Sequence, residues 1–282
     1  MAVALADRLR ARGEDPVAIS ADALQVYQGL ETLTGAATPE EQAQLEHRLL
    51  SFVPVTKTFS VGEFMPLAHH EIDAALEAGR QPIVVGGTGL YLRAALTNLS
   101  LKPPPPAGVR ERLERELAAR GPAEMHARLV EMAPGAAATI EPSDRSRIVR
   151  ALELAEIGQL DEAPPEASEL WTEETRRPTL LAGLVMEREA LYETIDRRVD
   201  AMVAAGAREE AKRAHAAGAS RTARAALGFQ ELLEGDVEAM RRRTRNYAKR
   251  QLTWMRKLPG LRTIDVTGRE PRDVAEEIAG AA

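Results

Sequence analysis

Short apolar segments alternate along this chain with longer segments of helical spacing. The segments 16–20, 82–86, 179–186 and 262–266 are short and mostly apolar, which is typical of strands that are buried on both faces. Between them, apolar residues recur at intervals of three and four, which predicts helices with one buried face. Strands that alternate with helices favour a parallel sheet with crossover helices, so the pattern predicts an α/β fold.

Two proline-rich segments divide the chain. Residues 102–106 read Lys-Pro-Pro-Pro-Pro, a stiff extended linker, and residues 162–166 read Glu-Ala-Pro-Pro-Glu, a second break. The segments 108–120, 122–132 and 143–157 between them have helical spacing, and the first is rich in charges four residues apart. We therefore predict a helical insertion domain over 103–166 and an α/β core formed by 1–102 and 167–282.

A glycine-rich turn follows the predicted strand at 82–86. The sequence there reads Gly86-Gly87-Thr88-Gly89 and leads into the next helical segment. Glycines leave the backbone open to close approach, and the N–H groups at the start of a helix favour an anion such as phosphate. The turn predicts a phosphate-binding site, while an ordinary tight turn before a helix is the alternative.

Asp22 follows another predicted strand, at 16–20. Ligands of open α/β sheets bind beyond the carboxyl ends of the strands, so Asp22 and the turn at 86–89 are expected to face one crevice. A carboxylate and an anion-binding turn would then share a site. The alternative for Asp22 is an N-cap of the following helix.

A basic segment lies near the end of the chain. Its eight cations fall within seventeen residues that contain no acid: Arg241, Arg242, Arg243, Arg245, Lys249, Arg250, Arg256 and Lys257. On a helix, Arg243, Arg250 and Lys257 would share one face. The net charge of the whole chain is -6, so any nucleic-acid surface has to be local. A solvated helix face is the alternative.

Composition excludes several classes of protein. With 44% hydrophobic and 28% charged residues, the 282-residue chain can form a core, and no apolar run reaches the roughly 20 residues of a membrane span. There is no cysteine, and the five histidines show no metal-ligand spacing. Charges at Asp7, Arg8 and Arg10 argue against a signal peptide. We expect a cytoplasmic monomer without a membrane partner or a protein-held metal.

Seven segments together resemble the tRNA dimethylallyltransferases, which prenylate the adenine 3′ of the anticodon. The resemblance spans nearly the whole chain and implies a P-loop NTPase-like, nucleotide-binding parallel sheet flanked by helices. The matching segments are Ser20–Asp22 with Gln25–Tyr27, Phe59–Phe64, Pro82–Tyr91, Arg147–Glu153, Ile195–Val199, Leu227–Leu232 and Tyr247–Arg256.

The chain departs from the family pattern in two places. Residues 32–37 read Thr-Leu-Thr-Gly-Ala-Ala, where many members have Ile-Gly-Thr-Ala-Lys-Pro. Members also open with a strand and a Gly-x-x-x-x-Gly-Lys-[Ser/Thr] loop that binds the donor diphosphate. No Gly-Lys pair occurs in this chain, and residues 1–9 match the helix expected after that loop. We expect the first strand and the phosphate loop to be absent, and turnover by the chain as given to be lost.

The resemblance implies transfer of a dimethylallyl group from dimethylallyl diphosphate to N6 of the adenine, with release of diphosphate. Asp22 corresponds to the base, and Thr88 and Arg198 to groups that act on the diphosphate. The catalytic residues would be Asp22, Thr88 and Arg198, and the diphosphate would lie against Gly86, Gly87, Thr88 and Arg198. Mg²⁺ is expected on the diphosphate.

The same resemblance implies a set of tRNA contacts. They are Asp22, Ala23, Leu24, Gln25, Arg147, Arg150, Gly228, Phe229, Gln230, Lys249, Arg250, Gln251, Trp254 and Arg256. Two alternatives stay open: a prenyltransferase of free adenylate, and an RNA-binding protein without catalysis because the phosphate loop is missing. An ATP-using kinase is a weaker third, since it would need that loop.

Overall fold

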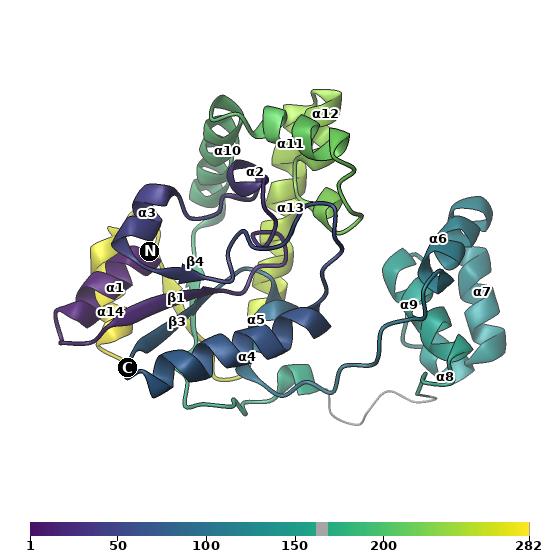
Figure 1. Ribbon diagram of the computed structural model, residues 1–282, viewed down its shortest axis with the longest axis horizontal. Helices are drawn as coiled ribbons and strands as arrows, with labels where there is room; N and C mark the ends of the chain where they lie inside the picture. The colour runs from purple at the N-terminus through teal and green to yellow at the C-terminus, as the bar shows by residue number, and fades with distance from the viewer. Residues whose placement is uncertain (162–168, 282) are drawn as a thin grey trace. The chain divides into compact units, whose positions relative to one another are not determined.

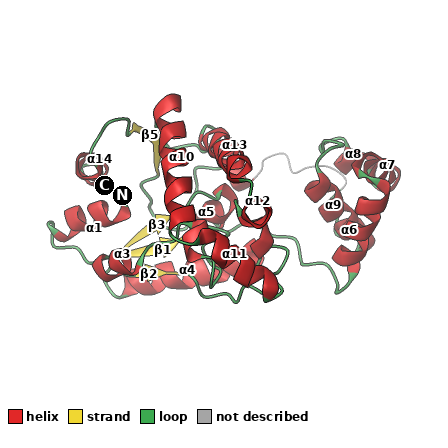
Figure 2. Ribbon diagram, turned by 90° about the horizontal axis from the view of Figure 1, so that it is seen from above, coloured by secondary structure: helices red, strands yellow, loops and turns green. Residues whose placement is uncertain are grey.

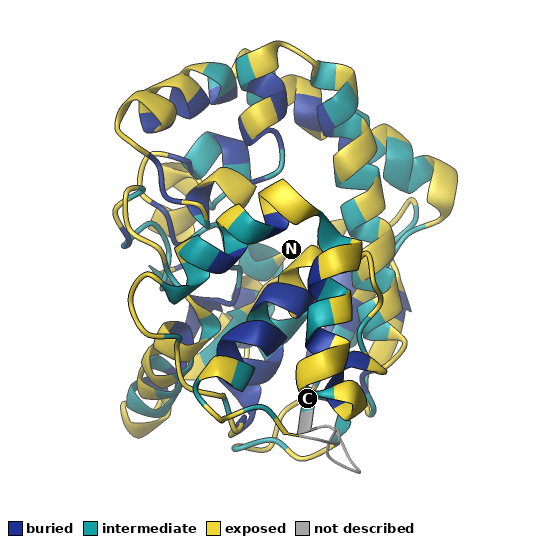
Figure 3. Cartoon of the chain, turned by 90° about the vertical axis from the view of Figure 1, so that its right-hand side faces the viewer, coloured by how far each residue is buried: buried dark blue, intermediate teal, exposed yellow. Residues whose placement is uncertain are grey.

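The computed structural model describes residues 1–161 and 169–281, so the predicted break at 162–166 lies outside the described residues. The chain divides into two compact units, Met1–Leu99 with Leu170–Ala282, and Ser100–Glu169. Figure 1 shows the first unit as strands flanked by helices and the second as helices alone. In both units, helices carry buried and exposed residues in alternation, as amphipathic packing requires (Figure 3).

The first unit contains a three-stranded parallel sheet. Strand β1 (Pro16–Ser20) lies between β2 (His47–Arg48) and β3 (Gln81–Val85), and Ala18 is opposite both His47 and Ile83. Every residue of β1 is buried, which agrees with its apolar run. The predicted strands at 16–20 and 82–86 are confirmed within a residue. Strand β2 was not predicted, because two residues are too few to show a hydrophobic pattern.

A second sheet pairs β4 (Ala182–Val185) with β5 (Arg262–Asp265), also in parallel. The N–H of Arg262 donates to the carbonyl of Leu181, and that of Val266 donates to the carbonyl of Val185, both at 2.8 Å. Figure 2 marks the strands of both sheets in yellow. Among the described residues, no strand joins this sheet to the first.

A groove runs between the two sheets. Its volume is about 660 Å³, and it is lined by the whole of β3 and β4 together with the helix α1 (Ala2–Arg10). In the described part of the chain, β3 pairs only with β1, and β4 only with β5, so each strand has one unpaired edge. Pro82 suits this place, because its nitrogen has no hydrogen and lies on the unpaired edge of β3.

Helices cover the sheets of the first unit (Figure 1). Helix α4 (Val61–Glu77) packs against β1, β3 and α5 (Gly89–Leu96), where the rings of Phe64 and Tyr91 lie 4.7 Å apart. Ser60 caps α4, and Glu63 completes a capping box. Helix α1 packs against α14 (Pro271–Ala279).

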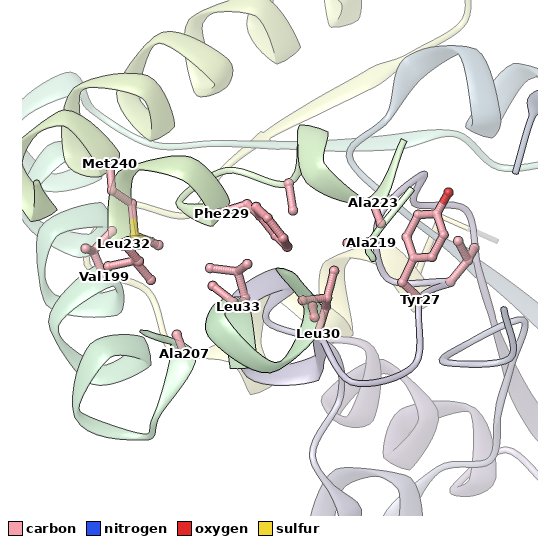
Figure 4. Close-up of a cluster of buried hydrophobic side chains, with 14 of the residues drawn as sticks. Tyr27, Leu30, Leu33, Val199, Ala207, Ala219, Ala223, Phe229, Leu232 and Met240 are labelled. Carbon is pink, nitrogen blue, oxygen red and sulfur yellow. The ribbon is translucent and has the colours of Figure 1, made fainter. Parts of the chain in front are cut away.

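A large apolar cluster joins the remaining helices of this unit. It contains Tyr27, Leu33 and Phe229, all with 3% exposure or less (Figure 4). The helices involved are α2 (Glu31–Thr34), α10 (Arg188–Ala204), α11 (Ala207–Ala216), α12 (Phe229–Glu234) and α13 (Val237–Met255). Short helices α3 (Pro39–Gln44) and η2 (Ala223–Ala225) complete the connections.

The second unit is helical. It comprises α6 (Val109–Arg120), α7 (Pro122–Met132), α8 (Pro134–Ala137) and α9 (Arg145–Glu156), and a 3-10 turn, η1 (Glu169–Trp171), follows at the boundary of the units. Its own core includes Leu113, Leu129 and Leu152. The predicted helices at 108–120, 122–132 and 143–157 are all present. Within the described ranges, no helix is long and apolar enough to cross a membrane.

Candidate active site

The glycine turn joins β3 to α5, as its sequence predicted. Thr88 is the N-cap residue of α5, but its side chain makes no cap bond. A Cβ at Gly86 would collide with the carbonyl of Ala21, and one at Gly87 with the side chain of Gln251. Neither glycine has a positive φ. These glycines are therefore required by close packing against neighbouring segments rather than by a left-handed backbone.

Asp22 and Thr88 lie together, as expected for residues at the carboxyl ends of paired strands. The hydroxyl of Thr88 lies 3.4 Å from Asp22 Oδ2 and accepts from the N–H of Ala23 at 3.3 Å. The N–H groups of Leu24 and Gln25 donate to Asp22 Oδ1 at 2.9 and 3.3 Å. These amides belong to a turn, not to a helix, so the helix-cap alternative does not hold. One carboxylate oxygen is fixed by backbone, and the other is directed toward Thr88.

Gln25 and Arg198 both donate to the backbone of Gly35. Gln25 Nε2 donates to the carbonyl of Gly35 at 3.2 Å, and Arg198 Nη2 donates to the same oxygen at 3.4 Å. Gly35 has a φ of +61°, and a Cβ there would collide with the Arg198 guanidinium. The loop at 32–37, where the family lysine is missing, therefore holds two of the predicted site residues by its backbone.

Two side chains from α13, Tyr247 and Gln251, complete the site. Gln251 is a predicted tRNA contact, whereas Tyr247 was not predicted as a site residue. Tyr247 donates its hydroxyl to the carbonyl of Gly87 at 3.1 Å and lies 3.4 Å from Thr88 Oγ1. Gln251 Nε2 donates to the same carbonyl at 3.0 Å. Burial, above all, raises the pKa of Tyr247, so its hydroxyl stays protonated at neutral pH. One indication of this role came from the sequence, because Tyr247 lies in the segment Tyr247–Arg256 that resembles the family.

The expected basic surface on α13 is smaller than the sequence suggested. Its first four arginines form ion pairs with acids, most of them on other elements: Arg241 with Asp200 and Glu238, Arg242 with Asp236, Arg243 with Glu231, and Arg245 with Asp196. The basic segment itself contains no acid, but acids from neighbouring parts of the chain lie beside it. This half of the helix is therefore largely neutralised.

The second half of the basic segment keeps its charge. Among the residues that the structure describes, no carboxylate forms an ion pair with Lys249, Arg250, Arg256 or Lys257. Arg250 lies 5.5 Å from the ring centre of Tyr247, and Lys257 lies 5.4 Å from that of Trp171. This cationic half begins two residues after Tyr247.

Other predicted tRNA contacts in the first unit have structural roles. Trp254 lies against Trp171 with ring centres 4.7 Å apart, and a Cβ on Gly89 would collide with its indole. Phe229 is fully buried in the cluster of Figure 4, while Gly228 has a φ of +91°. The exposed Gln230 donates to Glu234 at 2.6 Å. Of these three residues, Gln230 alone is exposed, because Gly228 and Phe229 are buried.

Arg147 and Arg150 lie on α9 of the second unit. Arg147 is 71% exposed at its side chain and pairs with Asp144 at 3.4 Å. Arg150 instead donates to the carbonyls of Lys102 and Pro103 at 3.0 and 2.8 Å and pairs with the buried Glu153. It therefore ties the proline linker to α9, and Arg147 is the freer of the two to meet a phosphate.

The described side chains of the site do not form a set of metal ligands. In the described ranges, no three His, Asp or Glu side chains come together as ligands. Asp22 is the carboxylate of the site, and one of its oxygens already accepts two backbone bonds. Mg²⁺ in such a site would be held mainly by the oxygens of a bound diphosphate, a role that suits its preference for substrate phosphates.

Comparisons with known proteins identify relatives over most of the chain. The sequence profile of the IPP transferase family matches residues 25–258. The tRNA dimethylallyltransferase of Streptomyces coelicolor is 41% identical over 253 residues, 86% of this chain and 79% of the relative. That of Kineococcus radiotolerans is 38% identical over 98% of this chain and 90% of its own length.

Two solved structures have a similar fold. The full-length tRNA isopentenylpyrophosphate transferase of Bacillus halodurans matches with a TM-score of 0.69 at 32% identity, covering 99% of this chain and 89% of that one. A eukaryotic dimethylallyltransferase acting on tRNA matches with a TM-score of 0.73 at 23% identity, covering 100% of this chain and 74% of its own. The second likeness concerns the fold alone.

Proposed function

Because the chain belongs to the IPP transferase family, whose members include tRNA dimethylallyltransferases, we propose that it prenylates an adenine of tRNA. The donor is dimethylallyl diphosphate, and the acceptor is N6 of the adenine 3′ of the anticodon. The observation that carries this proposal is the 3.4 Å approach of Thr88 Oγ1 to Asp22 Oδ2 beside the glycine turn. A base and a diphosphate-binding element share one site.

Both the nucleophile and the leaving group of this reaction require catalysis. The N6 amine is a weak nucleophile because its lone pair is delocalised into the ring, and the diphosphate gains charge as it leaves. The N6 lone pair attacks C1 of the dimethylallyl group while the C1–O bond breaks, and the bond pair leaves with diphosphate. Asp22 accepts the proton that N6 then loses. Thr88 and the N–H groups of the turn stabilise the leaving oxygens.

Arg198 and Mg²⁺ complete the diphosphate site in this proposal. The guanidinium of Arg198 is tethered by the carbonyl of Gly35 and carries a charge suited to diphosphate. A Mg²⁺ ion held by the diphosphate oxygens would lower the charge of the leaving group. The adenine has to leave its stack to reach Asp22, as bases do in other enzymes that modify them.

The wider setting follows from the substrate. A tRNA substrate places the enzyme in the cytoplasm, and we propose that it acts as a monomer. The core formed by 1–102 and 167–282 binds the donor and tRNA, while the helical insertion, 103–166, contributes Arg147. The main tRNA surface of the core is the cationic half of the basic segment, 249–257, of which Arg256 and Lys257 follow the end of α13.

Label transfer tests the function directly. The protein is incubated with radiolabelled dimethylallyl diphosphate and either unmodified tRNA or AMP. Because turnover by the chain as given is expected to be lost, the rate is measured on a form that carries the family's Gly-x-x-x-x-Gly-Lys-[Ser/Thr] loop. There we expect label in tRNA alone, and Asp22→Asn should lower the rate by roughly 10²–10⁴ while tRNA binding stays within a few fold. Label in AMP would indicate the adenylate prenyltransferase. Binding of tRNA without label in either acceptor would indicate an RNA-binding protein without catalysis.

A further inference from the structure

Two donors from one helix converge on a single carbonyl of the glycine turn. Tyr247 Oη and Gln251 Nε2 both donate to the Gly87 oxygen, at 3.1 and 3.0 Å. The two residues are four apart on α13 and so lie on the same face of that helix. Other contacts also hold α13 on the core, because Met240 is buried in the cluster of Figure 4 and Ala248 packs against it.

The direction of this carbonyl decides the direction of the next N–H. A trans peptide is planar, so the Gly87 carbonyl and the Thr88 N–H point in opposite directions. Gly87 has no Cβ to restrict rotation of that peptide, and without partners it could turn over. Both donors draw the oxygen toward α13. The Thr88 N–H is thereby aimed away from α13.

We propose that Tyr247 and Gln251 are positioning residues that orient the Thr88 N–H for the donor diphosphate. This inference rests on the proposed function of the site. The same tyrosine hydroxyl lies 3.4 Å from Thr88 Oγ1, which in turn faces Asp22, so one side chain aligns the turn with the base. Gln251 then serves the donor rather than tRNA.

The packing keeps both side chains in place. Any Cβ at Gly87 would overlap the Gln251 amide, which therefore lies directly on the turn. The ring of Tyr247 is covered by the Arg250 guanidinium at 5.5 Å. Since Arg250 belongs to the cationic half of α13, the helix that would meet tRNA phosphates is the one that holds the diphosphate turn.

The test compares Tyr247→Phe, Gln251→Leu and the double variant. Each change removes a donor and keeps the bulk of the side chain. Tyr192→Phe and Gln42→Leu are matched controls, since the Tyr192 ring lies against Arg245 and the Gln42 amide donates to the carbonyl of Ala37. Affinity for inorganic diphosphate is measured by calorimetry, affinity for tRNA by filter binding, and KM for the donor where turnover is measured.

We expect the two single variants to lose little, because one donor still holds the carbonyl. The double variant should bind diphosphate roughly five- to tenfold more weakly, the scale of a lost hydrogen bond, with a matching rise in donor KM. Tm and tRNA affinity should stay close to those of the controls. A fall in Tm with equal losses for both ligands would overturn the proposal in favour of a general structural role.

The result is also independent of turnover. Unchanged diphosphate affinity in the double variant overturns the positioning role, whether or not prenyl transfer is observed. Loss of tRNA affinity in Gln251→Leu alone would return that residue to the RNA surface. Absence of label transfer by the loop-containing form, with normal diphosphate binding, would contradict the proposed function and leave the positioning result standing.

Discussion

Single residues of this site differ in how far the sequence reveals them. Asp22 and Thr88 could be predicted to meet because each follows a strand, and strands of a parallel sheet end at the same edge. Tyr247 could not, since it reaches Gly87 across 160 residues from a helix whose own pattern is dominated by charge. Gln25 is a predicted tRNA contact, and in the structure its amide is bound by Gly35 and Ser20.

His69 gives the fold a dependence on pH. Its Nε2–H donates to the carbonyls of Ala94 and Thr97 at the end of α5, at 2.8 and 3.1 Å. Burial first, and then the charge of Arg176, lowers the pKa of His69 below its ordinary 6.5, although Asp73 opposes this. The unfolded chain therefore binds more protons below pH 6.5, and stability should fall as pH drops through that value toward the folded pKa.

His69→Gln tests this dependence, because glutamine can donate the same bond and does not titrate. Urea unfolding at pH 7.5 and pH 5.5 should show a smaller loss of stability in the variant than in the parent. His70→Gln, one residue away on α4, is the matched control and should leave the parent's difference intact. Equal losses in parent and His69→Gln would rule out His69 as the source.

At the scale of elements, the strands and most helices followed from hydrophobic spacing. The pattern failed where an element is held by distant contacts. Strand β2 has two residues, and α2 has four, its first N–H groups bound by Glu210 of α11. Helix α13 was predicted as a single basic face, but acids of α10 and α12 pair with its first half. Spacing within a segment does not reveal the charges that other elements place beside it.

The two halves of the basic segment should respond differently to mutation. Arg250→Gln with Lys257→Gln should weaken tRNA binding and lower the slope of log K against log salt by about one unit for each phosphate that the protein no longer neutralises. Arg241→Gln with Arg243→Gln removes the same charge from the paired half and should leave the slope nearly unchanged. Binding isotherms at several salt concentrations measure both. Equal slopes for the two double variants would contradict a division of this helix.

At the scale of the molecule, the strands of the first unit form two parallel sheets with a groove between β3 and β4. The apolar sequences of β3 and β4 predict that both faces of these strands are buried. The groove between the two strands leaves part of their surface exposed: Val85 is 42% exposed and Leu184 is 38% exposed. Unpaired strand edges beside apolar side chains promote association between chains. The apolar residues of a strand indicate that it favours a buried position. They do not indicate whether a neighbouring strand is present to pair with its edge.

A lysine in the groove should reduce this association. Leu184→Lys places a charge on the unpaired edge of β4, which disfavours pairing between molecules. Val130→Lys changes a residue of similar exposure, 44%, on α7 of the second unit, and Val130 is not one of the residues that line the groove. Sedimentation velocity over a range of concentrations should show less self-association for Leu184→Lys and no change for Val130→Lys. Equal behaviour of the two variants would remove the groove as the cause.

The unpaired edges also make hydrogen exchange alternate along each strand. The N–H groups of successive residues in a parallel strand point to opposite neighbours. On β3, Ile83 and Val85 face β1, while Val84 faces the groove. On β4, Gly183 and Val185 face β5, while Ala182 and Leu184 face the groove. Deuterium should therefore label Val84, Ala182 and Leu184 well before their immediate neighbours, a period-two signal that a strand paired on both edges would not give.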